Sequence, residues 1–322
     1  YMEISKKCNL SCRHCYKPRE KMKPDLGFEK MKKLVDELHE MGVLEIRLCG
    51  NEPTTSPYFF EICNYIKSLD FYLGVNTNAY FDKNMQEKII ELEPDFVVVS
   101  VDGNKETHDT IRATGSYDKA VSFLERLNQT NITRRINTLL SRVTMDSIEH
   151  IARLAERNGA GVSFLPLRTI GKETNFKDDE AINASDMFFA VRKITALRKK
   201  YSNTMLLTYF DLLSEKAIYH HSMDFNKPCP SRKNGFITYN GDFFPCDFLK
   251  YLGDKYFCGN VAEEGFSSVW CHSQVLRNFQ CIEHEKCKTC EFYMTKCYGG
   301  CISGAIASTN RPDDELCFAH LL

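Results

Sequence analysis

Three cysteines near the start of the chain, Cys8, Cys12 and Cys15, are close enough in sequence to act together. We call them the cysteine triplet. Three thiolates at these intervals can hold three corners of a [4Fe–4S] cube. The fourth iron would then lack a protein ligand, and that open coordination position is where chemistry can occur. A structural zinc ion is the alternative interpretation, because His14 lies in the same segment and could complete the site.

A second group of cysteines lies towards the other end of the 322-residue chain. The chain has 15 cysteines, and none occurs between Cys63 and Cys229. A disulfide framework would be spread more evenly, whereas thiols separated by two or three residues are typical of metal ligands. We therefore expect reduced cysteines in a reducing, anoxic cytoplasm. The candidate metal ligands of this second group are Cys229, Cys246, Cys287, Cys290, Cys297, Cys301 and Cys317.

The charge of the chain is almost balanced, with 42 Lys and Arg against 43 Asp and Glu and a net charge of −1. This balance gives no electrostatic footprint for nucleic acid or for an anionic membrane. The longest strongly apolar stretch, residues 96–101, is too short to span a bilayer. No signal peptide is recognisable. We expect a cytoplasmic protein that binds neither nucleic acid nor a membrane.

The elements that must position these residues alternate between strands and helices over the first two-thirds of the chain. A helix is predicted over residues 28–41, because apolar residues recur there at three- and four-residue spacings. Strands alternating with such helices favour right-handed βαβ units and a parallel sheet. Six units are too few to close an eight-stranded barrel, so the predicted fold is α/β, an open, partial (β/α)6 TIM barrel. The predicted strands are residues 2–5, 45–50, 72–78, 95–102, 134–140 and 161–167.

Two further elements are predicted after the sixth unit, a helix over residues 185–200 with Ser185 as its N-cap and a strand near 204–210. From about residue 222 the composition changes, since cysteine, glycine and aromatic residues become frequent and long periodic helices disappear. A small domain without a large core usually needs metal or disulfide cross-links. We predict a partial barrel over residues 1–220 and a small Cys-rich iron–sulfur domain over residues 221–322.

The segment CNLSCRHCY, residues 8–16, resembles the signature of the radical S-adenosylmethionine (radical SAM) superfamily. Later segments resemble further motifs of this family in the expected order, and the likeness covers about residues 1–200. In the family these loops converge at the C-terminal mouth of a partial barrel, where α/β barrels usually place their sites. Asn51 stands where glycine is more usual, and asparagine tolerates a positive φ better than most residues. The segments are Cys49-Gly50-Asn51-Glu52-Pro53, Asn76-Thr77-Asn78, and Ser100-Val101-Asp102-Gly103 followed by Arg112.

The resemblance implies how S-adenosylmethionine (AdoMet) would bind. AdoMet would chelate the open iron of a cluster at the cysteine triplet, and Glu52 with the backbone of residues 50–52 would receive its amino group. Ser100 and Asp102 would lie near its ribose or carboxylate, and Arg112 would help to anchor the carboxylate. Without the resemblance, Ser100 and Asp102 could cap the next helix, and Arg112 could form a surface salt bridge. The implied cofactor-binding residues are Gly50, Asn51, Glu52, Pro53, Asn78, Ser100, Asp102 and Arg112.

The C-terminal cysteines resemble the SPASM extension of radical SAM enzymes, which carries auxiliary clusters. The likeness implies three [4Fe–4S] clusters in all, one that binds AdoMet and two auxiliary ones. One auxiliary cluster would be held by Cys287, Cys290, Cys297 and Cys317. The other, nearer the active site, would be held by Cys229, Cys246 and Cys301. A zinc ribbon is the alternative for Cys287, Cys290, Cys297 and Cys301.

The fourth ligand of the nearer auxiliary cluster is left open by the sequence. An open or non-cysteine position is one interpretation, and a ligand among Cys258, Cys271 and Cys281 is the other. Five cysteines lie outside the motifs, and such cysteines are usually small buried hydrophobic residues. They are Cys49, Cys63, Cys258, Cys271 and Cys281.

Asp247, directly after Cys246, is the candidate catalytic residue. In sulfatase-maturating relatives an acid at this place is proposed to take a proton from the substrate radical. Loss of that proton turns the radical into a strong reductant that can pass an electron to an auxiliary cluster. A plain hydrogen bond near a cluster is the alternative role for Asp247.

The resemblance implies a radical SAM oxidoreductase that cleaves AdoMet reductively to a 5′-deoxyadenosyl radical. The expected reaction is an oxidative modification of a peptide or protein, by a thioether or carbon–carbon crosslink or a side-chain oxidation. The expected redox partner is a flavodoxin or ferredoxin. Such enzymes often carry a peptide-recognition domain before the barrel, and none precedes Tyr1 in this sequence. Three interpretations stay open: the chain is trimmed, a separate recognition protein supplies that domain, or the substrate differs. The alternatives are a sulfatase-type formylglycine maturase and an enzyme acting on a tetrapyrrole or sugar. A zinc or iron–sulfur regulator is the alternative outside enzymes.

Overall fold

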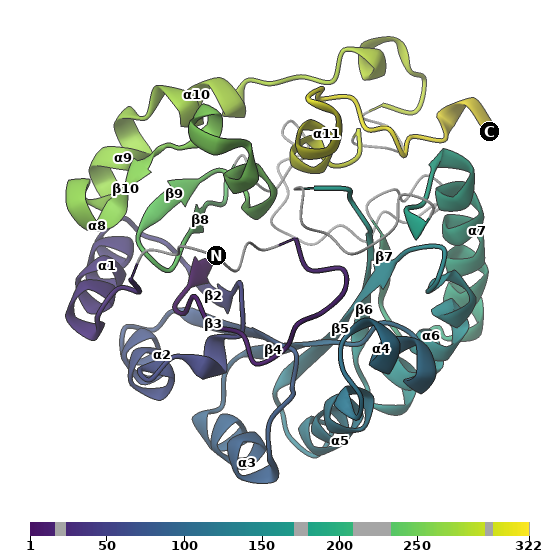
Figure 1. The fold of residues 1–322 in the computed structure, drawn as a ribbon, viewed down its shortest axis with the longest axis horizontal. Coiled ribbons are helices and arrows are strands. Elements are labelled where there is room, and N and C mark those ends of the chain that lie inside the picture. The colour runs from purple at the N-terminus through teal and green to yellow at the C-terminus, as the bar shows by residue number, and fades with distance from the viewer. Residues whose placement is uncertain (17–23, 171–179, 209–232, 294–298, 322) are drawn as a thin grey trace.

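The computed structural model describes residues 1–16, 24–170, 180–208, 233–293 and 299–321. Seven strands among these residues form a continuous parallel array in chain order, and the array curves into an arc around an open centre (Figure 1). The predicted open α/β barrel is therefore confirmed. The strands are β1 (Met2–Glu3), β2 (Glu45–Cys49), β3 (Tyr72–Thr77), β4 (Phe96–Ser100), β5 (Thr133–Leu140), β6 (Gly161–Pro166) and β7 (Leu206–Thr208).

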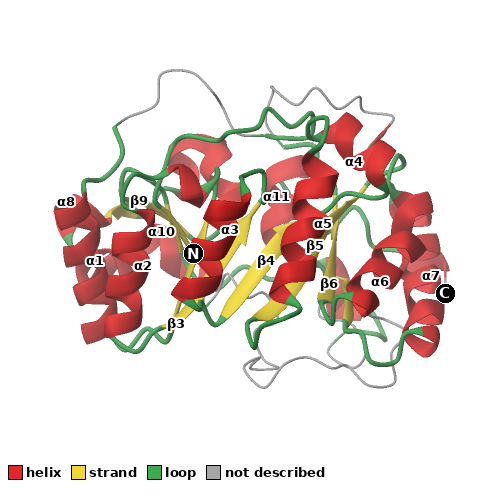
Figure 2. Ribbon diagram, turned by 90° about the horizontal axis from the view of Figure 1, so that it is seen from below, coloured by secondary structure: helices red, strands yellow, loops and turns green. Residues whose placement is uncertain are grey.

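Helices cover the outer side of the arc, as Figures 1 and 2 show. In α1 the predicted apolar face is the buried one, because Met31, Leu34, Val35 and Leu38 are all buried. The helices are α1 (Phe28–Glu40), α2 (Phe59–Ser68), α3 (Lys83–Leu92), α4 (Lys105–Ile111), α5 (Ser116–Leu127), α6 (Ile148–Arg157) and α7 (Ala184–Lys200).

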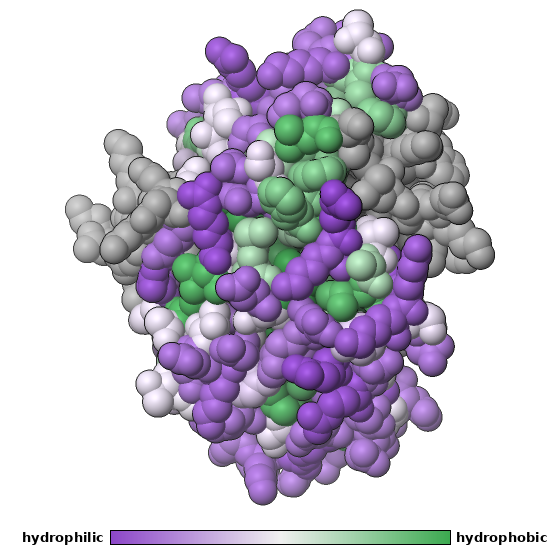
Figure 3. All heavy atoms as spheres, turned by 90° about the vertical axis from the view of Figure 1, so that its right-hand side faces the viewer, coloured by the Kyte–Doolittle hydropathy of each residue, from purple (hydrophilic) through white to green (hydrophobic). Residues whose placement is uncertain are grey.

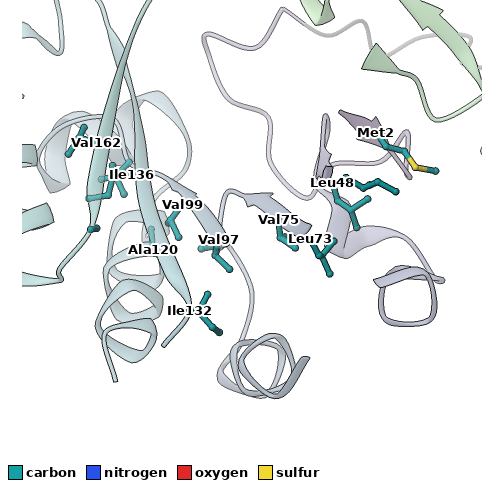
Figure 4. Packing of buried hydrophobic residues seen from close by; sticks show 14 of the residues in the cluster. Met2, Leu48, Leu73, Val75, Val97, Val99, Ala120, Ile132, Ile136 and Val162 are labelled. Atoms are coloured by element: carbon teal, nitrogen blue, oxygen red, sulfur yellow. The ribbon is translucent and has the colours of Figure 1, made fainter. Parts of the chain in front are cut away.

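The main core lies between the strands and these helices. Val97 and Val99 of β4, each fully buried, point to the same side of the sheet, as alternate residues of a strand must. Ala120 of α5 lies opposite them in the same buried cluster, and Val75 and Ile136 continue it along β3 and β5 (Figure 4). This core fixes the strand ends whose loops carry the candidate site.

The start of α7 differs from its prediction. The N-cap is Asn183 rather than Ser185. The Asn183 side chain accepts from the backbone N of Asp186, and the Asp186 carboxylate accepts from the backbone N of Asn183. This reciprocal pair satisfies two backbone donors at the helix start, which a serine two residues later could not do.

The arc does not end at β1, because three strands from the C-terminal part continue the same sheet. β8 (Phe236–Ile237) pairs with β1 in parallel, and β9 (Asp242–Phe244) and β10 (Gly259–Asn260) follow in antiparallel pairing. The predicted domain boundary near residue 220 lies outside the described residues. Short helices follow, namely α8 (Val261–Glu264), α9 (Phe266–His272), α10 (Gln274–Gln280) and α11 (Ile302–Thr309).

The position of α11 matters for the site, because it lies at the open side of the arc (Figure 1). It packs against a 3₁₀ segment, Asp247–Tyr256, that begins directly after Cys246. Ile302 and Ile306 of α11 share a small buried cluster with Leu249 and Tyr256 of that segment. Cys246 and Cys301 therefore lie at the starts of two elements that pack against each other.

The face that carries α7 is mostly hydrophilic, with scattered apolar side chains (Figure 3). Phe189 of α7 has 62% of its surface exposed. Single exposed apolar residues of this kind are normal on folded proteins. No helix in the described part of the chain is long and apolar enough to cross a membrane.

Candidate active site

The cysteine triplet lies on the loop that leaves β1 and crosses the open centre of the arc (Figure 1). Cys8 is exposed, and Cys12 and Cys15 are half-buried. Two backbone hydrogen bonds hold the second half of this loop, between Cys12 and Cys15. Cys15 N donates to Cys12 O at 3.1 Å, and Arg13 N donates to Ile111 O at the end of α4 at 2.8 Å.

The donor set of the triplet fits an iron–sulfur cluster. Burial raises the pKa of Cys12 to about 11, Arg112 opposes this shift, and the neighbouring Cys8 and Cys15 add to it. The three thiols are therefore near one another, and a positive metal centre would relieve the cost of ionising them. Among the described residues, no three His, Cys, Asp or Glu side chains converge as ligands of a single ion. A cube does not require such convergence, because each thiolate binds a different iron.

Glu52, in the loop after β2, is fully buried and is already surrounded by protein donors. Its Oε1 accepts from the hydroxyls of Thr54 at 2.8 Å and Thr77 at 2.9 Å, and its Oε2 accepts from Asn78 N at 2.8 Å. Burial raises the pKa of Glu52, although these hydrogen bonds act in the opposite direction. The carboxyl group thus ties the end of β2 to the end of β3.

The turn that precedes Glu52 depends on Gly50. Its φ is +102°, and a Cβ at this position would lie 2.2 Å from Cγ of Glu3. Asn51 is not among the non-glycine residues with positive φ in the described chain, so the substitution of the usual glycine causes no strain there. Its side chain donates to Ser5 O at 3.2 Å. Pro53 opens the 3₁₀ helix Pro53–Thr55.

Asn78, at the end of β3, connects this turn to the triplet. Its amide nitrogen lies 2.8 Å from Oδ1 of Asn9 and 3.8 Å from Sγ of Cys8. Its Oδ1 accepts from Tyr80 N at 2.7 Å, which closes a tight turn. The next residue, Ala79, has φ of +56° and is fully buried. A left-handed alanine is costly, and such strain is found at sites that the surrounding structure holds in place.

Asp102 and Arg112 form a buried ion pair beside the triplet. Arg112 Nε lies 2.6 Å from Oδ2 of Asp102, and the two side chains are 11% and 1% exposed. Burial disfavours the Asp102 charge, but Arg112, with smaller contributions from His14, His108 and the backbone hydrogen bond from Leu139, outweighs it, and the pKa of Asp102 falls to about 2. The surface salt bridge considered for Arg112 is therefore wrong. Asn104, not Asp102 or Ser100, caps α4 by accepting from Thr107 N.

Ser100 is the last residue of β4, is half-buried, and lies two positions before Asp102. His14 is turned towards the pair, with its Nδ1 4.0 Å from Oδ2 of Asp102. Burial lowers the pKa of His14 to about 4. The imidazole is therefore neutral near pH 7.

Asp247 lies across from the triplet, and the structure gives it partners that the sequence did not reveal. Its Oδ2 accepts from the Tyr16 hydroxyl at 2.7 Å, over a separation of 231 residues. Its Oδ1 lies 2.7 Å from Nζ of Lys250, and the same Nζ lies 2.9 Å from Oε1 of Glu3. Among these partners, only Tyr16 could have been suspected from the sequence, because it directly follows Cys15. The contacts of Lys250 with Asp247 and Glu3 depend on the fold.

The charge states in this network follow from burial and pairing. Burial acts against the charge of Lys250, but Asp247 and Glu3 outweigh it and raise its pKa well above the usual value. Burial, followed by the Asp247 charge, raises the pKa of Tyr16 well above that of a free phenol. Tyr16 therefore remains a hydrogen-bond donor to Asp247, and Lys250 remains positively charged.

The C-terminal candidate ligands are only partly within the described residues. Cys246, Cys287, Cys290, Cys301 and Cys317 are all half-buried. Cys229 and Cys297 lie outside the described residues.

Asp314 joins two of these ligands. Its Oδ2 accepts from Cys301 N at 2.8 Å, and its backbone O accepts from Cys317 N at 3.1 Å.

The prediction for the remaining cysteines holds in part. Cys49, Cys63 and Cys258 are buried, and burial raises the pKa of Cys258 to about 11. Cys271 and Cys281 are exposed, so the expectation that they are buried hydrophobic residues is wrong. Both exposed cysteines lie at helix ends: Cys271 is near the end of α9, and Cys281 directly follows α10.

Comparison with known proteins finds a family match for the N-terminal part of the chain and another for the C-terminal part. Residues 2–155 match the radical SAM superfamily, and residues 229–291 match SPASM, described as an iron–sulfur cluster-binding domain. The mycofactocin maturase MftC of Mycolicibacterium smegmatis is 28% identical over 97% of this chain and 81% of its own length. The AdoMet-dependent heme synthase of Methanosarcina barkeri is 27% identical over 95% of this chain and 91% of its own length.

A solved structure has the same fold. The structure of native anSMEcpe with bound AdoMet and the Cp18Cys peptide has a TM-score of 0.79 at 18% identity. The match covers 99% of this chain and 94% of that one.

Proposed function

Because the chain is a radical SAM enzyme with a C-terminal SPASM iron–sulfur domain, we propose that it oxidatively modifies a peptide with the help of three [4Fe–4S] clusters. The peptide would acquire a thioether or carbon–carbon crosslink or an oxidised side chain. Iron–sulfur clusters and AdoMet follow from the two domains, whereas the number of clusters and the substrate are the proposal. A peptide is supported by the fold shared with anSMEcpe, whose structure contains one.

The hydrogen bond between Tyr16 and Asp247 carries this proposal. Tyr16 follows the last cysteine of the triplet, and Asp247 follows Cys246, a proposed ligand of the nearer auxiliary cluster. The bond therefore joins the loop that would hold the catalytic cluster to the loop that would hold an auxiliary one. A substrate bound between the two loops could lose a hydrogen atom on one side and an electron on the other.

Different residues around the triplet would bind different parts of AdoMet. When bound, the cluster and AdoMet together supply a 5′-deoxyadenosyl radical that takes a hydrogen atom from the substrate. The Glu52 carboxyl group is occupied by Thr54, Thr77 and Asn78, so the backbone of residues 50–52 would receive the AdoMet amino group. Glu52 would keep that backbone in place.

The opposite side of the AdoMet site would be polar and positively charged. Arg112 is fixed by Asp102 beside Cys12 and would attract the AdoMet carboxylate. Ser100, at the end of β4, would face the ribose or carboxylate. Since Asp102 is buried and paired with Arg112, its role would be to orient the Arg112 guanidinium group and not to contact AdoMet itself.

Asp247 would act as the base on the substrate. Tyr16 and Lys250 each contact one of its carboxylate oxygens, which fixes the orientation of the group. After hydrogen-atom abstraction the substrate radical would give its proton to Asp247 and its electron to the auxiliary cluster. The substrate thus loses a hydrogen atom, a proton and an electron, and each has a stated acceptor.

The test uses a precursor peptide encoded next to the gene, with reconstituted enzyme, AdoMet and dithionite. We expect 5′-deoxyadenosine and a peptide whose mass falls by two hydrogens for each modification. Asp247→Asn should still form 5′-deoxyadenosine, but peptide oxidation should fall about 10²-fold or more. Asp254→Asn, on the exposed part of the same 3₁₀ segment, is the matched control and should behave as the parent. Equal loss in both variants, or full activity of Asp247→Asn, contradicts the assigned role.

A second candidate is a small tetrapyrrole substrate, because the relative from Methanosarcina barkeri is a heme synthase of almost the same length. The same assay with a tetrapyrrole in place of the peptide distinguishes the two. Substrate-dependent 5′-deoxyadenosine with the tetrapyrrole alone would replace the peptide proposal. An aldehyde in the peptide product would indicate formylglycine formation instead of a crosslink.

A further inference from the structure

Arg168 lies two residues after β6 and is 4% exposed, so the barrel places a charged side chain in the interior. Its Nη2 lies 2.7 Å from Oδ2 of Asp314, and its Nη1 lies 2.8 Å from Oδ1 of Asp314 and 2.8 Å from Oε1 of Glu315. A two-pronged contact of this kind fixes the plane and orientation of the guanidinium group. The barrel is thereby joined to the C-terminal segment.

The third nitrogen of the guanidinium group has no such partner. Arg168 Nε is buried and makes no hydrogen bond within the described residues. Leaving a buried N–H of a charged group without an acceptor costs free energy, so an acceptor is expected at this position.

The sulfur of Cys301 lies on the side of Arg168 where that acceptor is expected. A Cβ built on Gly304 would be 3.0 Å from Arg168 Nε and 3.2 Å from Cys301 Sγ, so both atoms lie against the same glycine. Gly304 N donates to that Sγ at 3.3 Å.

We propose that Arg168 is a positioning and tuning residue of the auxiliary cluster that Cys301 helps to hold, donating from Nε to its sulfur ligands. The inference rests on the proposed function, because it requires Cys301 to be a cluster ligand. A cluster gains negative charge when it accepts an electron, and hydrogen bonds to its sulfurs favour that reduced state. Arg168 therefore raises the reduction potential of this cluster and improves it as the electron acceptor.

Asp314 extends the consequence to the geometry of the cluster. Oδ2 of Asp314, which accepts from Arg168 Nη2, also accepts from Cys301 N. Arg168 thus orients the carboxylate that fixes the backbone of Cys301. The end of β6, which lines the barrel, is connected to the auxiliary cluster through one side chain.

The test measures reduction potentials in a variant that lacks the cysteine triplet (Cys8→Ala, Cys12→Ala, Cys15→Ala), so that only auxiliary clusters remain. Arg168→Lys keeps the positive charge but removes the Nε–H. In an EPR-monitored titration we expect one auxiliary signal to move to a more negative potential while the other stays. Gly304→Ala, whose methyl group would press on Arg168 Nε and Cys301 Sγ, should shift the same signal in the same direction.

Glu315→Gln is the matched control. The Glu315 side chain is 34% exposed and binds Nη1 of Arg168, so its loss leaves Nε in place. Removing this negative charge should change the potential little, and towards more positive values. A negative shift as large as that of Arg168→Lys would mean that general disturbance, not the Nε–H, sets the potential, and it would overturn the proposal.

A second measurement decides the matter if Arg168→Lys fails to retain iron. The triplet-less protein is prepared with ¹⁵N-labelled arginine and examined by pulsed EPR in the reduced state. Nitrogen coupling from arginine to one auxiliary cluster supports the inference, and its absence overturns it. Iron-loaded clusters with unchanged potentials in Arg168→Lys and Gly304→Ala would also overturn it. If the triplet-less protein takes up no iron at all, the auxiliary clusters of the proposed function fail instead, and the inference fails with them.

Discussion

Single buried polar groups determine the shape of the proposed AdoMet site. Glu52 and Asp102 are both almost completely buried, yet their carboxyl groups face different partners. Glu52 accepts from neutral hydroxyl and backbone donors, and burial raises its pKa. Asp102 pairs with Arg112 and keeps its charge. The first group is built to hold a turn, and the second is built to hold a cation beside the triplet.

Glu52→Gln tests the first role. The amide would place an N–H group against donors that now all point at carboxylate oxygens, so we expect a loss of about 2 kcal/mol in unfolding free energy. The dissociation constant for AdoMet should rise about tenfold as the turn loosens. Urea unfolding and equilibrium dialysis measure the two effects. Glu91→Gln on the exposed side of α3 is the control and should change stability by less than about 0.5 kcal/mol.

His108 gives the protein a specific pH dependence. Its Nδ1 accepts from Asp102 N at 3.0 Å, and burial followed by the Arg112 charge lowers its pKa to about 4. The unfolded chain binds the proton near pH 6.5, so this contribution to stability is complete above that pH. This stability is lost as the pH falls from about 6.5 to about 4. The loss in unfolding free energy reaches about 2 kcal/mol at pH 5.

The measurement is urea unfolding of the iron-free protein at pH 7 and pH 5. His108→Asn keeps a neutral acceptor that does not titrate, so its stability should fall less between the two pH values than that of the parent. An equal fall in both proteins would show that His108 is not the group responsible.

At the scale of elements, the loops between strands and helices carry the site, and their glycines set what those loops can do. Gly50→Ala should lower the unfolding free energy by about 3 kcal/mol, since the new Cβ would meet Glu3 at 2.2 Å and φ is +102°. Two controls separate the causes. Gly42→Ala, with φ of +71° but open space, should cost about 1 kcal/mol, and Gly27→Ala, with open space and φ of −72°, should cost almost nothing. Equal effects at Gly50 and Gly42 would exclude the contact with Glu3 as the cause.

The repeating strands and helices could be predicted because their signals are local. The apolar runs of β3 to β6 and the amphipathic pattern of α1 depend only on residues a few positions apart. The parallel pairing of β8 with β1 could not be predicted in this way, because it joins residues more than 200 positions apart. The start of α7 was also missed, since serine and asparagine are both good N-caps and only the reciprocal bond with Asp186 decides between them.

The site shows the same division between local and distant information. Sequence motifs identified the triplet, Gly50, Glu52, Asp102 and Arg112 as residues of one loop cluster, and the structure brings them to one end of the barrel. The motifs did not identify Lys250 and Arg168, which are ordinary in sequence and acquire a role only from their buried partners. The ligand roles of the cysteines stay predictions from resemblance.

At the scale of the whole molecule, the N-terminal and C-terminal parts share one sheet and meet at buried charged contacts. Lys250 and Glu3 form one such contact, and Arg168 and Asp314 form another. Each of these pairs joins a residue of the barrel to a residue of the C-terminal part. Arg168→Met would leave Asp314 buried and unpaired, and we expect a loss of about 3 kcal/mol or more in unfolding free energy. Arg142→Met, whose pair with Asp186 is more exposed, is the control and should lose less than about 1 kcal/mol.

The most direct test of the account counts iron and sulfide in anaerobically reconstituted protein and in the triple variant Cys8→Ala, Cys12→Ala, Cys15→Ala. The same samples are assayed for dithionite-dependent 5′-deoxyadenosine. We expect about twelve irons in the parent and about eight in the variant, with 5′-deoxyadenosine formation lost only in the variant. About four irons or fewer in the fully reconstituted parent, or 5′-deoxyadenosine formation that survives in the variant, would contradict it.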